Sequence, residues 1–412
     1  MREGLPDEGN HDTEKGVMFM EKYDVIVVGA GPAGSMAARE AAKAGASVLI
    51  LERRKEIGAP VRCGEGIGSH WMNEFGMKVS DKAISAHING SLIVAPNLKD
   101  TIRVRTAETK GVVVDRKVFD KDLALEAGRA GAKIMIKSEV VEVKKDGGKV
   151  TGVVVEADGR KEEFYSKVLI AADGGESTVA RMAGINSTAS LYDSDFGVEY
   201  EMVNVDCEDL IEIYFSREYA PRGYVWVFPK GKDVANVGVG IGGAEKGSHA
   251  IEYLDRFLKL ERFKKAQPVA IKAGVIPVGA PMKGLVLDGF MVAGTAAHQV
   301  DPIHGGGICL AMDAGMMAGR VAAKCAIAGK TDAKSLSEYE SAWREKREKK
   351  LLKRLMLRKV LEKLNDDDLN AIIGSVGDED IEKLLNSNFV PVVKKVLLKR
   401  PQLLKVLEVL VK

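Results

Sequence analysis

The chain has 412 residues, a net charge of +2 and a hydrophobic fraction of 46%, so it is long enough for one large or two medium domains. Its charged fraction of 29% is ordinary for a globular protein. No apolar run approaches the roughly 20 residues of a membrane-spanning helix. The four cysteines are far apart and no secretory signal precedes the fold, so we expect a cytoplasmic protein with free thiols.

The first strong pattern begins after residues 1–20, a polar and aperiodic stretch that we expect to be a disordered leader. A short buried-strand run, 24–28, ends in Gly-Ala-Gly-Pro-Ala-Gly at 29–34. An alanine-rich helical stretch follows to residue 44, and a second strand, 46–51, ends at Glu52. Strand, glycine turn, helix and strand in this order predict a βαβ unit that holds a dinucleotide.

Each part of this unit has a physical reason to contact the cofactor. The glycines permit a tight turn and let the backbone approach a pyrophosphate at the positive helix N-terminus. An acidic residue at the end of the second strand suits the ribose hydroxyls of the adenosine. The residues assigned to the dinucleotide here are Gly29, Gly31, Ala33, Gly34, Glu52 and Arg53.

The remaining pattern predicts two interleaved parts and a tail. The stretch 115–130 reads as a helix, strands are expected at 133–144 and 150–157, and a helix is expected near 248–266. The expected fold class is α/β: a glutathione-reductase-like, Rossmann-type FAD domain, an inserted antiparallel β substrate domain and a helical C-terminal region. The predicted ranges are 21–77, 113–189 and 281–335 for the FAD domain, 78–112 and 190–280 for the substrate domain, and 336–412 for the tail.

Two later segments resemble the FAD-binding segments of FAD-dependent hydroxylases and their relatives. One is the strand 168–172, which ends in Asp173-Gly-Gly and is followed by Ser177 and Arg181. The other is Gly294-Thr295-Ala-Ala-His298, followed by Gly-Gly-Gly at 305–307. The superfamily usually has Asp at the position of Thr295, so we expect FAD binding that is retained but altered. A helix N-terminus facing the flavin would stabilise the negative charge of its reduced form.

Two further motifs narrow the resemblance. Pro60-Val-Arg-Cys63-Gly-Glu-Gly66 follows the first βαβ unit, and Tyr224-x-Trp226-x-Phe228-Pro-Lys precedes Asn236-Val-Gly-Val-Gly240. Together with the FAD segments they resemble the archaeal geranylgeranyl reductase family, over nearly the whole chain from Tyr23. The resemblance implies an FAD-dependent enzyme that saturates C=C bonds of geranylgeranyl chains in ether phospholipids, and so acts in membrane lipid biosynthesis. By resemblance alone, the residues at the flavin are Gly34, Glu52, Cys63, Gly64, Gly66, Arg116, Val140, Gly307 and Ile308.

The aromatic motif has a physical interpretation of its own. Alternation along a strand places Tyr224, Trp226 and Phe228 on one face. They would either line a channel for an isoprenoid chain or pack a sheet on its core; the neighbouring motifs favour the channel. Cys63 is a candidate catalytic residue, and an apolar contact with the flavin is the alternative. His298 and His304 flank Asp301 and are expected to shape the flavin loop rather than bind a metal.

The basic tail suggests a membrane surface. Residues 344–359 carry nine Lys/Arg against two Glu, and 391–412 carry six against one. Apolar residues in both pieces recur at roughly helical spacing, so the alternatives are helices packed on the body or a face that meets anionic lipid. The expected partners are therefore an isoprenoid lipid, an anionic membrane and an electron donor, either ferredoxin, a reduced deazaflavin or NADPH, and not nucleic acid.

Three other functions stay open at this stage. An FAD monooxygenase or a quinone-type oxidoreductase could use the same fold, since fold alone does not define the reaction. A non-catalytic lipid carrier that keeps FAD as a structural group is the third alternative. Oxygen-dependent turnover with NADPH would indicate the monooxygenase, and a flavin that lipid cannot reoxidise would indicate the carrier.

Overall fold

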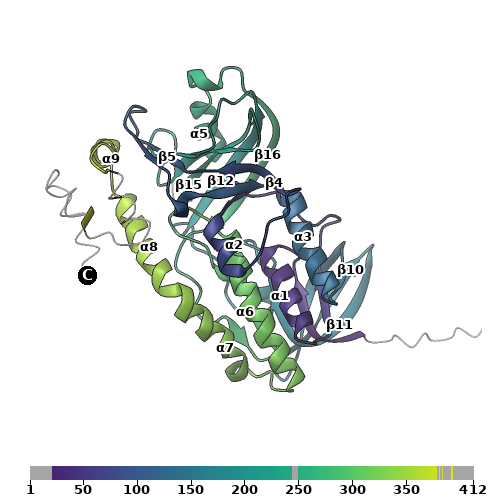
Figure 1. Cartoon of the computed structure of the whole chain (residues 1–412). Helices are drawn as coiled ribbons and strands as arrows, with labels where there is room; N and C mark the ends of the chain where they lie inside the picture. Colours follow the sequence, from purple (N-terminus) through teal and green to yellow (C-terminus); the bar gives the residue numbers. More distant parts are fainter. Residues whose placement is uncertain (1–20, 244–248, 378–379, 381–382, 384–390, 393–412) are drawn as a thin grey trace, which may run out of the picture.

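The computed structural model describes residues 21–243, 249–377, 380, 383 and 391–392. Two large sheets lie one above the other, and a row of C-terminal helices runs along one side of both (Figure 1). The predicted leader, 1–20, and nearly all of the second basic stretch, 391–412, fall outside the described residues. Within the described part of the chain, no helix is both long and apolar enough to cross a membrane.

The first large sheet has eight strands and contains the predicted βαβ unit. Its main path runs β17-β18-β11-β1-β2-β8, with parallel pairing from β18 to β8, and β9 and β10 extend it from β11. The strands are β1 (Glu21–Val28), β2 (Val48–Leu51), β8 (Lys133–Met135), β9 (Ser138–Asp146), β10 (Lys149–Ala157), β11 (Arg160–Ala171), β17 (Val286–Leu287) and β18 (Phe290–Val292). Central strands buried on both faces explain the runs of Val, Ile and Leu at 25–28, 48–51 and 168–171.

Helices pack on this sheet, and two of them approach each other closely. Those that matter here are α1 (Pro32–Lys43), α3 (Arg116–Arg129), α4 (Val179–Ala183) and α6 (Ile308–Ile327). A Cβ on Gly315 of α6 would lie 2.1 Å from the carbonyl oxygen of Ala33, and one on Gly319 would lie 2.1 Å from that of Ala37. The glycines therefore let α6 press directly on the backbone of α1.

The second large sheet has seven strands in the order β16-β12-β15-β14-β13-β5-β6. Its strands are β5 (Ser91–Val94), β6 (Thr101–Val104), β12 (Ser194–Val203), β13 (Ile211–Tyr214), β14 (Tyr224–Pro229), β15 (Val234–Gly242) and β16 (Gln267–Pro277). All neighbours are antiparallel except β13 and β5. Helix α5 (Ala250–Phe257) packs on one face through Leu254 and Phe257. The opposite face turns toward the eight-stranded sheet.

A small third sheet joins the two large ones. It consists of β3 (Gly66–Gly68), β7 (Gly111–Val114) and β4 (Ile84–Ile88), and α2 (Ser69–Phe75) follows β3. The stretch 78–112 therefore contributes to two sheets, since β4 belongs here while β5 and β6 belong to the seven-stranded sheet. The domain boundaries given above stay a prediction.

Two predicted elements were wrong in detail. The expected strand 133–144 is two strands, because Lys137 between them has φ = 54° and turns the chain. β8 then pairs parallel with β2, whereas β9 pairs antiparallel with β10. The expected helix near 248–266 is α5 followed by a short 3₁₀ turn at Glu261–Phe263.

The C-terminal helices are α7 (Ala333–Trp343), α8 (Lys349–Leu361) and α9 (Asp366–Ile373), with a π-helical turn at Arg344–Glu348. Trp343 and Tyr339 are fully buried, which anchors α7 on the eight-stranded sheet. Helix α8 runs from the end of α7 toward the seven-stranded sheet (Figure 1). Its Arg358 bonds Asp195 of β12 at 2.7 Å, so the tail ties the two sheets together.

Candidate functional site

The turn from β1 to α1 uses its three glycines for different purposes. A Cβ on Gly29, where φ is +99°, would lie 2.5 Å from the carbonyl oxygen of Ala172, and one on Gly34 would lie 1.8 Å from that of Gly29. A Cβ on Gly31 would meet nothing within 4 Å. Two glycines are thus required by the fold itself, and the third borders open space at the N-terminus of α1, where a pyrophosphate would lie.

Glu52 closes this turn from the neighbouring strand. It is 9% exposed at the end of β2, and its two carboxylate oxygens accept hydrogen bonds from the backbone N–H groups of Ala30 and Arg54, each at 2.9 Å. Each oxygen keeps a further lone pair for a ribose hydroxyl. Arg53 is exposed, 3.9 Å from Glu176, and Val140 is buried on β9, whose first residue, Ser138, donates its N–H to the carbonyl of Glu52.

The two later segments meet at the ends of β11 and β18. Asp173 accepts hydrogen bonds from Thr178 and Val179 through Oδ2, at 2.9 and 3.1 Å. Its Oδ1 is buried and has no hydrogen-bond partner in the described part of the chain, although buried polar atoms normally have one. Thr295 lies opposite, because a Cβ on Gly175 would be 3.3 Å from its methyl carbon.

A second helix N-terminus opens toward the same place. Gly307 precedes the 20-residue helix α6, and no side chain caps the helix there. A Cβ on Gly307 would lie 3.4 Å from Oγ1 of Thr295, and Ile308 is buried behind it. The free N–H groups at the start of α1 and α6, the space at Gly31 and the unpaired oxygen of Asp173 together fit a dinucleotide flavin.

The Cys-Gly-Glu-Gly motif lies between these segments and the seven-stranded sheet. A Cβ on Gly64 would lie 3.0 Å from the ring of Phe228, and one on Gly66 3.4 Å from it. The loop therefore contacts β14 closely, so the two motifs that are 160 residues apart in sequence form one site. The sulfur of Cys63 accepts a hydrogen bond from the N–H of Glu65 at 3.2 Å. Burial raises the pKa of this thiol, which Arg116 only partly offsets, so it stays protonated.

The three aromatic side chains of β14 form a row on the face turned toward this loop. Ring centroids are 5.9 Å apart between Tyr224 and Trp226 and 6.4 Å apart between Trp226 and Phe228. The hydroxyl of Tyr224 donates to the carbonyl of His304 in the flavin loop at 2.6 Å. A Cβ on Gly238 of the next strand, β15, would lie 2.3 Å from the indole of Trp226, and one on Gly240 would lie 3.7 Å from it. Gly238 and Gly240 therefore make room for this ring.

A pocket adjoins the Tyr224 end of the aromatic row. It lies between the seven-stranded sheet and the C-terminal helices, and its apolar lining includes Phe215, Tyr224, Pro302, Ile303, Leu361 and Leu364. A partly apolar pocket that reaches the aromatic row at Tyr224 suits a hydrocarbon chain. The arginines beside it are already bonded, among them Arg358, which pairs with Asp195 and Glu362, each at 2.7 Å.

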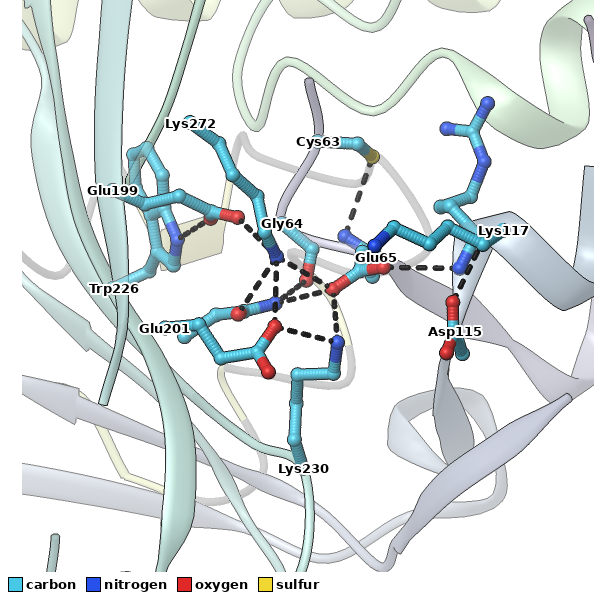
Figure 2. Close-up of polar contacts among 12 residues, drawn as sticks. Cys63, Gly64, Glu65, Asp115, Lys117, Glu199, Glu201, Trp226, Lys230 and Lys272 are labelled. Atoms are coloured by element: carbon cyan, nitrogen blue, oxygen red, sulfur yellow. Dashed lines mark hydrogen bonds and ion pairs between the residues drawn. The ribbon is translucent and has the colours of Figure 1, made fainter. Parts of the chain in front are cut away.

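A buried group of charges lies beside Trp226, and no sequence motif defines it as a unit. Figure 2 shows the carboxylates of Glu65, Glu199 and Glu201 meeting the ammonium groups of Lys230 and Lys272. The ion pairs are Glu65–Lys230 at 2.7 Å, Glu65–Lys272 at 2.9 Å, Glu199–Lys272 at 3.1 Å, Glu201–Lys230 at 3.0 Å and Glu201–Lys272 at 3.4 Å. We call these five residues the buried charge network.

Neighbouring groups hold the buried charge network in place. Trp226 donates its indole N–H to Glu199 at 2.9 Å. The amide of Asn236 donates to Glu65 at 2.7 Å and accepts from Lys272 at 3.0 Å. The other oxygen of Glu65 accepts from the backbone N–H of Arg116 at 3.0 Å. The network thus links the Cys63 loop, α3 and four strands of the seven-stranded sheet.

Only part of this network carries a signal in the sequence. Glu65 and Lys230 lie inside the two recognised motifs, and Asn236 opens the third, but none was assigned a role. Glu199 and Lys272 carry no motif. Their one signal is a charged residue between two uncharged neighbours in a strand. The cross-strand pairing of the two residues becomes visible only once the register is known.

The remaining candidate residues have local roles. Arg116 forms a two-pronged pair with Asp120, both contacts at 2.7 Å. His298 contacts the carbonyl of Ser187 at 3.0 Å, and His304 lies 3.3 Å from Asp301. Among the described residues there is no cluster of three or more His, Cys, Asp or Glu that could hold a metal.

Comparison with known proteins identifies the two halves of the site with two family models. Residues 24–216 match the family of FAD-dependent oxidoreductases, and residues 193–276 match the geranylgeranyl reductase catalytic domain. The second match spans most of the seven-stranded sheet, including β12, β14 and β16. The residues of the buried charge network other than Glu65 all lie within it.

Curated relatives and solved structures agree with these matches. The digeranylgeranylglycerophospholipid reductase of Methanocaldococcus jannaschii is 42% identical over 93% of this chain and 97% of its own. The enzyme of that name from Methanococcus vannielii is 44% identical with the same coverage. A geranylgeranyl bacteriochlorophyll reductase-like protein from Thermoplasma acidophilum superposes with a TM-score of 0.87 and 35% identity, covering 94% of this chain and 99% of its own.

Proposed function

The chain belongs to the geranylgeranyl reductase family of FAD-dependent oxidoreductases, and we propose that it saturates the C=C bonds of geranylgeranyl chains in archaeal ether phospholipids. It is an FAD-dependent enzyme. The observation that carries the choice of substrate is the contact between the Cys63–Gly66 loop and the aromatic row of β14. This contact places an apolar, aromatic surface directly beside the flavin segments.

The residues of the site divide the work between the cofactor and the substrate. Gly31, Glu52, Asp173, Thr295 and the N-terminus of α6 at Gly307 would hold FAD, which supplies hydride when it is reduced. Tyr224, Trp226 and Phe228 would orient the isoprenoid chain. No carbonyl activates an isolated alkene, so the rate must depend on alignment in a site that excludes water.

A proton must reach the second carbon of the double bond. Cys63 is our candidate for the group that delivers it, because its thiol is partly buried beside the aromatic row and stays protonated. Arg116 would stabilise the thiolate that remains after proton transfer. We therefore expect Cys63→Ser to reduce lipid more slowly than the unchanged enzyme, since a hydroxyl can still occupy the position. Cys63→Ala should reduce lipid more slowly again.

The direct test is a single-turnover reaction. Protein reduced with dithionite under anaerobic conditions is incubated with unsaturated archaeal ether lipid, and mass spectrometry follows the lipid. We expect gains of two hydrogens per reduced bond together with reoxidation of the flavin. Consumption of oxygen with NADPH and a hydroxylated product would instead indicate a monooxygenase. Bound flavin that lipid never reoxidises would indicate a lipid carrier.

The electron donor is tested in the same assay. We propose that ferredoxin, a reduced deazaflavin or NADPH reduces the enzyme. In the described part of the chain, the second Gly-x-Gly-x-x-Gly stretch, 238–243, begins within β15, which pairs antiparallel with both neighbours; it is therefore not a nicotinamide-binding βαβ unit. Replacing dithionite by each donor in turn, with flavin absorbance as readout, ranks the three.

We further propose that the enzyme works on the cytoplasmic surface of an anionic membrane, in keeping with its four free cysteines. About half of the predicted basic face has another role: Lys346, Arg347, Arg354 and Arg358 pair with acidic residues of the body, and Arg344 pairs with Glu340 of α7. The outer face of α8 differs. Leu352 and Met356 are 38% and 47% exposed there, flanked by the exposed Lys349, Lys353 and Lys359.

Vesicle co-sedimentation tests this face of α8. The triple change of Lys349, Lys353 and Lys359 to Gln should weaken binding to anionic vesicles more than about tenfold, at about 1 kcal/mol for each lysine near the surface. High salt should release the unchanged protein, since it screens these contacts. A matched triple change of the exposed Lys43, Lys161 and Lys330 serves as control. If both triple variants lose vesicle binding equally, this face of α8 is solvated surface and does not bind the membrane.

A further inference from the structure

The buried charge network contains an odd number of charges. With every group ionised, the carboxylates of Glu65, Glu199 and Glu201 carry three negative charges against the two positive charges of Lys230 and Lys272. Side-chain exposure is 0% for Glu65, 3% for Glu199 and 7% for Lys272. A net charge is costly to bury, and one additional proton on a carboxylate makes the network neutral.

The surroundings do not supply a compensating charge. Arg116 is neutralised by Asp120, and the exposed Arg62 by Glu176 at 2.8 Å. Asp195, on the same face of β12 as Glu199, is paired with Arg358 at 2.7 Å. Trp226 and Asn236 are uncharged, and the thiol of Cys63 is protonated. The extra proton therefore belongs to the buried charge network itself.

Glu199 is the carboxylate that holds this proton. The carboxylate of Glu65 forms ion pairs with both lysines and accepts hydrogen bonds from the amide of Asn236 and from a backbone N–H. The carboxylate of Glu201 forms ion pairs with both lysines. Glu199 has one ion pair, with Lys272, and one hydrogen bond, from Trp226 to Oε2. Its Oε1 is buried, with the ammonium of Lys272 at 3.1 Å and no hydrogen-bond partner among the described residues.

The electrostatics of the three carboxylates agree with the count. Burial raises the pKa of Glu199 to about 7, against the opposing attraction of Lys272. Burial also acts to raise the pKa of Glu65, but Lys230 and Lys272 lower it below its usual value. The pKa of Glu201 is lowered in the same way, with Lys230 as the main partner after burial. Of the three carboxylates, Glu199 is therefore the one that exchanges a proton near neutral pH.

We propose that the buried charge network stores the proton that alkene reduction consumes, with Glu199 as its carrier. The inference rests on the proposed function. When one double bond is reduced, its π bond breaks, one carbon takes the hydride that the reduced cofactor supplies, and the other carbon takes a proton. Cys63, which lies within electrostatic reach of Glu199, delivers that proton, and Glu199 restores it, becoming ionised. Glu201, 27% exposed, connects the network to solvent for the next proton.

The first test is the pH profile of the steady-state rate of lipid reduction, measured under anaerobic conditions with excess dithionite, because every turnover after the first requires Cys63 to be protonated again. In the unchanged enzyme the rate should be constant in mild acid and fall about tenfold per pH unit above the midpoint near pH 7, because only protonated Glu199 can restore the proton. Glu199→Gln should be slower and should lack this transition, while Glu199→Asp should recover part of the rate and keep it. FAD content and the melting temperature identify any variant that fails to fold.

The second test uses the charge count, which predicts shifts of opposite sign. Glu201→Gln leaves two carboxylates against two lysines, so Glu199 ionises more readily and the midpoint should move to lower pH. Lys230→Gln leaves three carboxylates against one lysine, so the midpoint should move to higher pH. Asp195→Asn, on the same strand but outside the network, should leave the midpoint in place. A purely structural network would alter stability in all of these variants and move no midpoint.

Infrared titration of the oxidised holoenzyme separates this inference from the proposed function. A carboxyl band that is present at pH 6, lost near pH 8 and absent from Glu199→Gln supports proton storage whether or not any lipid is reduced. Without alkene reduction the proposed function fails while this readout still stands. Alkene reduction with a flat pH profile, or with no such carboxyl band, overturns the inference alone.

Discussion

The two sides of the site are built by different means. The cofactor side uses backbone atoms and glycines: Gly29 and Gly34 are required by close approaches of 2.5 and 1.8 Å, and the helix ends present unbonded N–H groups. The substrate side uses side chains: three aromatic rings of β14 and the buried charge network, in which Glu65 of the Cys63 loop meets charged residues of the seven-stranded sheet and of the turn after β14. At Gly29 and Gly34 the fold leaves no room for an added atom, whereas a side-chain site can be changed by degrees.

Gly34→Ala should have the largest effect, because its new Cβ would be 1.8 Å from the carbonyl oxygen of Gly29. Backbone atoms on both sides cannot move apart without displacing α1 from β1. We expect a loss of about 3 kcal/mol or more in the free energy of unfolding and no bound FAD. Thermal unfolding of the apoprotein measures it. Gly31→Ala, whose Cβ meets nothing within 4 Å, is the control and should unfold like the unchanged apoprotein.

Gly31→Val should separate cofactor binding from folding. The valine has room in the protein alone but occupies the space in which the pyrophosphate would approach the backbone. We expect a colourless protein whose melting temperature equals that of the unchanged apoprotein, as measured by absorbance and calorimetry. Normal FAD content in this variant would mean that the pyrophosphate lies elsewhere, and the assignment of the turn would be wrong.

Trp226→Ala should act on the substrate side of the site. It removes a buried ring and leaves Glu199 without its indole donor, so we expect a loss of about 3–5 kcal/mol in stability and much slower lipid reduction. FAD content should stay near one per chain at temperatures where the protein is folded. Trp226→Phe keeps most of the packing and removes only the donor. If loss of flavin accounts for all the lost activity, the ring belongs to the cofactor side.

The same contrast explains what the sequence could predict. The β1–α1 turn and Glu52 lie within 24 residues, and their spacing alone indicates a strand, a helix and a ligand. The flavin segments at Asp173 and Thr295 were found by resemblance, since nothing local joins them. The buried charge network joins residues at 65, 199, 201, 230 and 272, and depends on the register of β12 with β16. The register between strands that are distant in sequence cannot be predicted from the local pattern of residues.

Local rules also failed where a single residue interrupts a strand. The left-handed conformation of Lys137, with φ = 54°, divides one expected strand into two that pair in opposite senses. The apolar stripe of the tail had two alternatives, and packing on the body holds for part of it: Leu351, Val360 and Leu364 are buried, whereas Leu352 is exposed. Packing against the body, which periodicity cannot show, decides each position.

Thr295→Asp should have the smallest effect of the changes considered. Thr295 is partly exposed, with Oγ1 turned toward Gly307 at the open end of α6. Asp is of similar size, and a carboxylate there would be favoured by the positive end of that helix. We therefore expect FAD affinity to be unchanged or tighter by a factor of about three, measured by fluorescence titration of the apoprotein.

Thr295→Val is the matched control for that titration, because it keeps the shape and removes the hydroxyl. If Oγ1 bonds the ribityl chain, Val should weaken FAD binding by about 1 kcal/mol, roughly fivefold. Equal affinity of Thr, Val and Asp would mean that this position makes no polar contact with the cofactor. A large loss with Asp alone would mean that the unpaired Oδ1 of Asp173 and the new carboxylate repel each other, which would place the two flavin segments closer together than a ribityl chain between them allows.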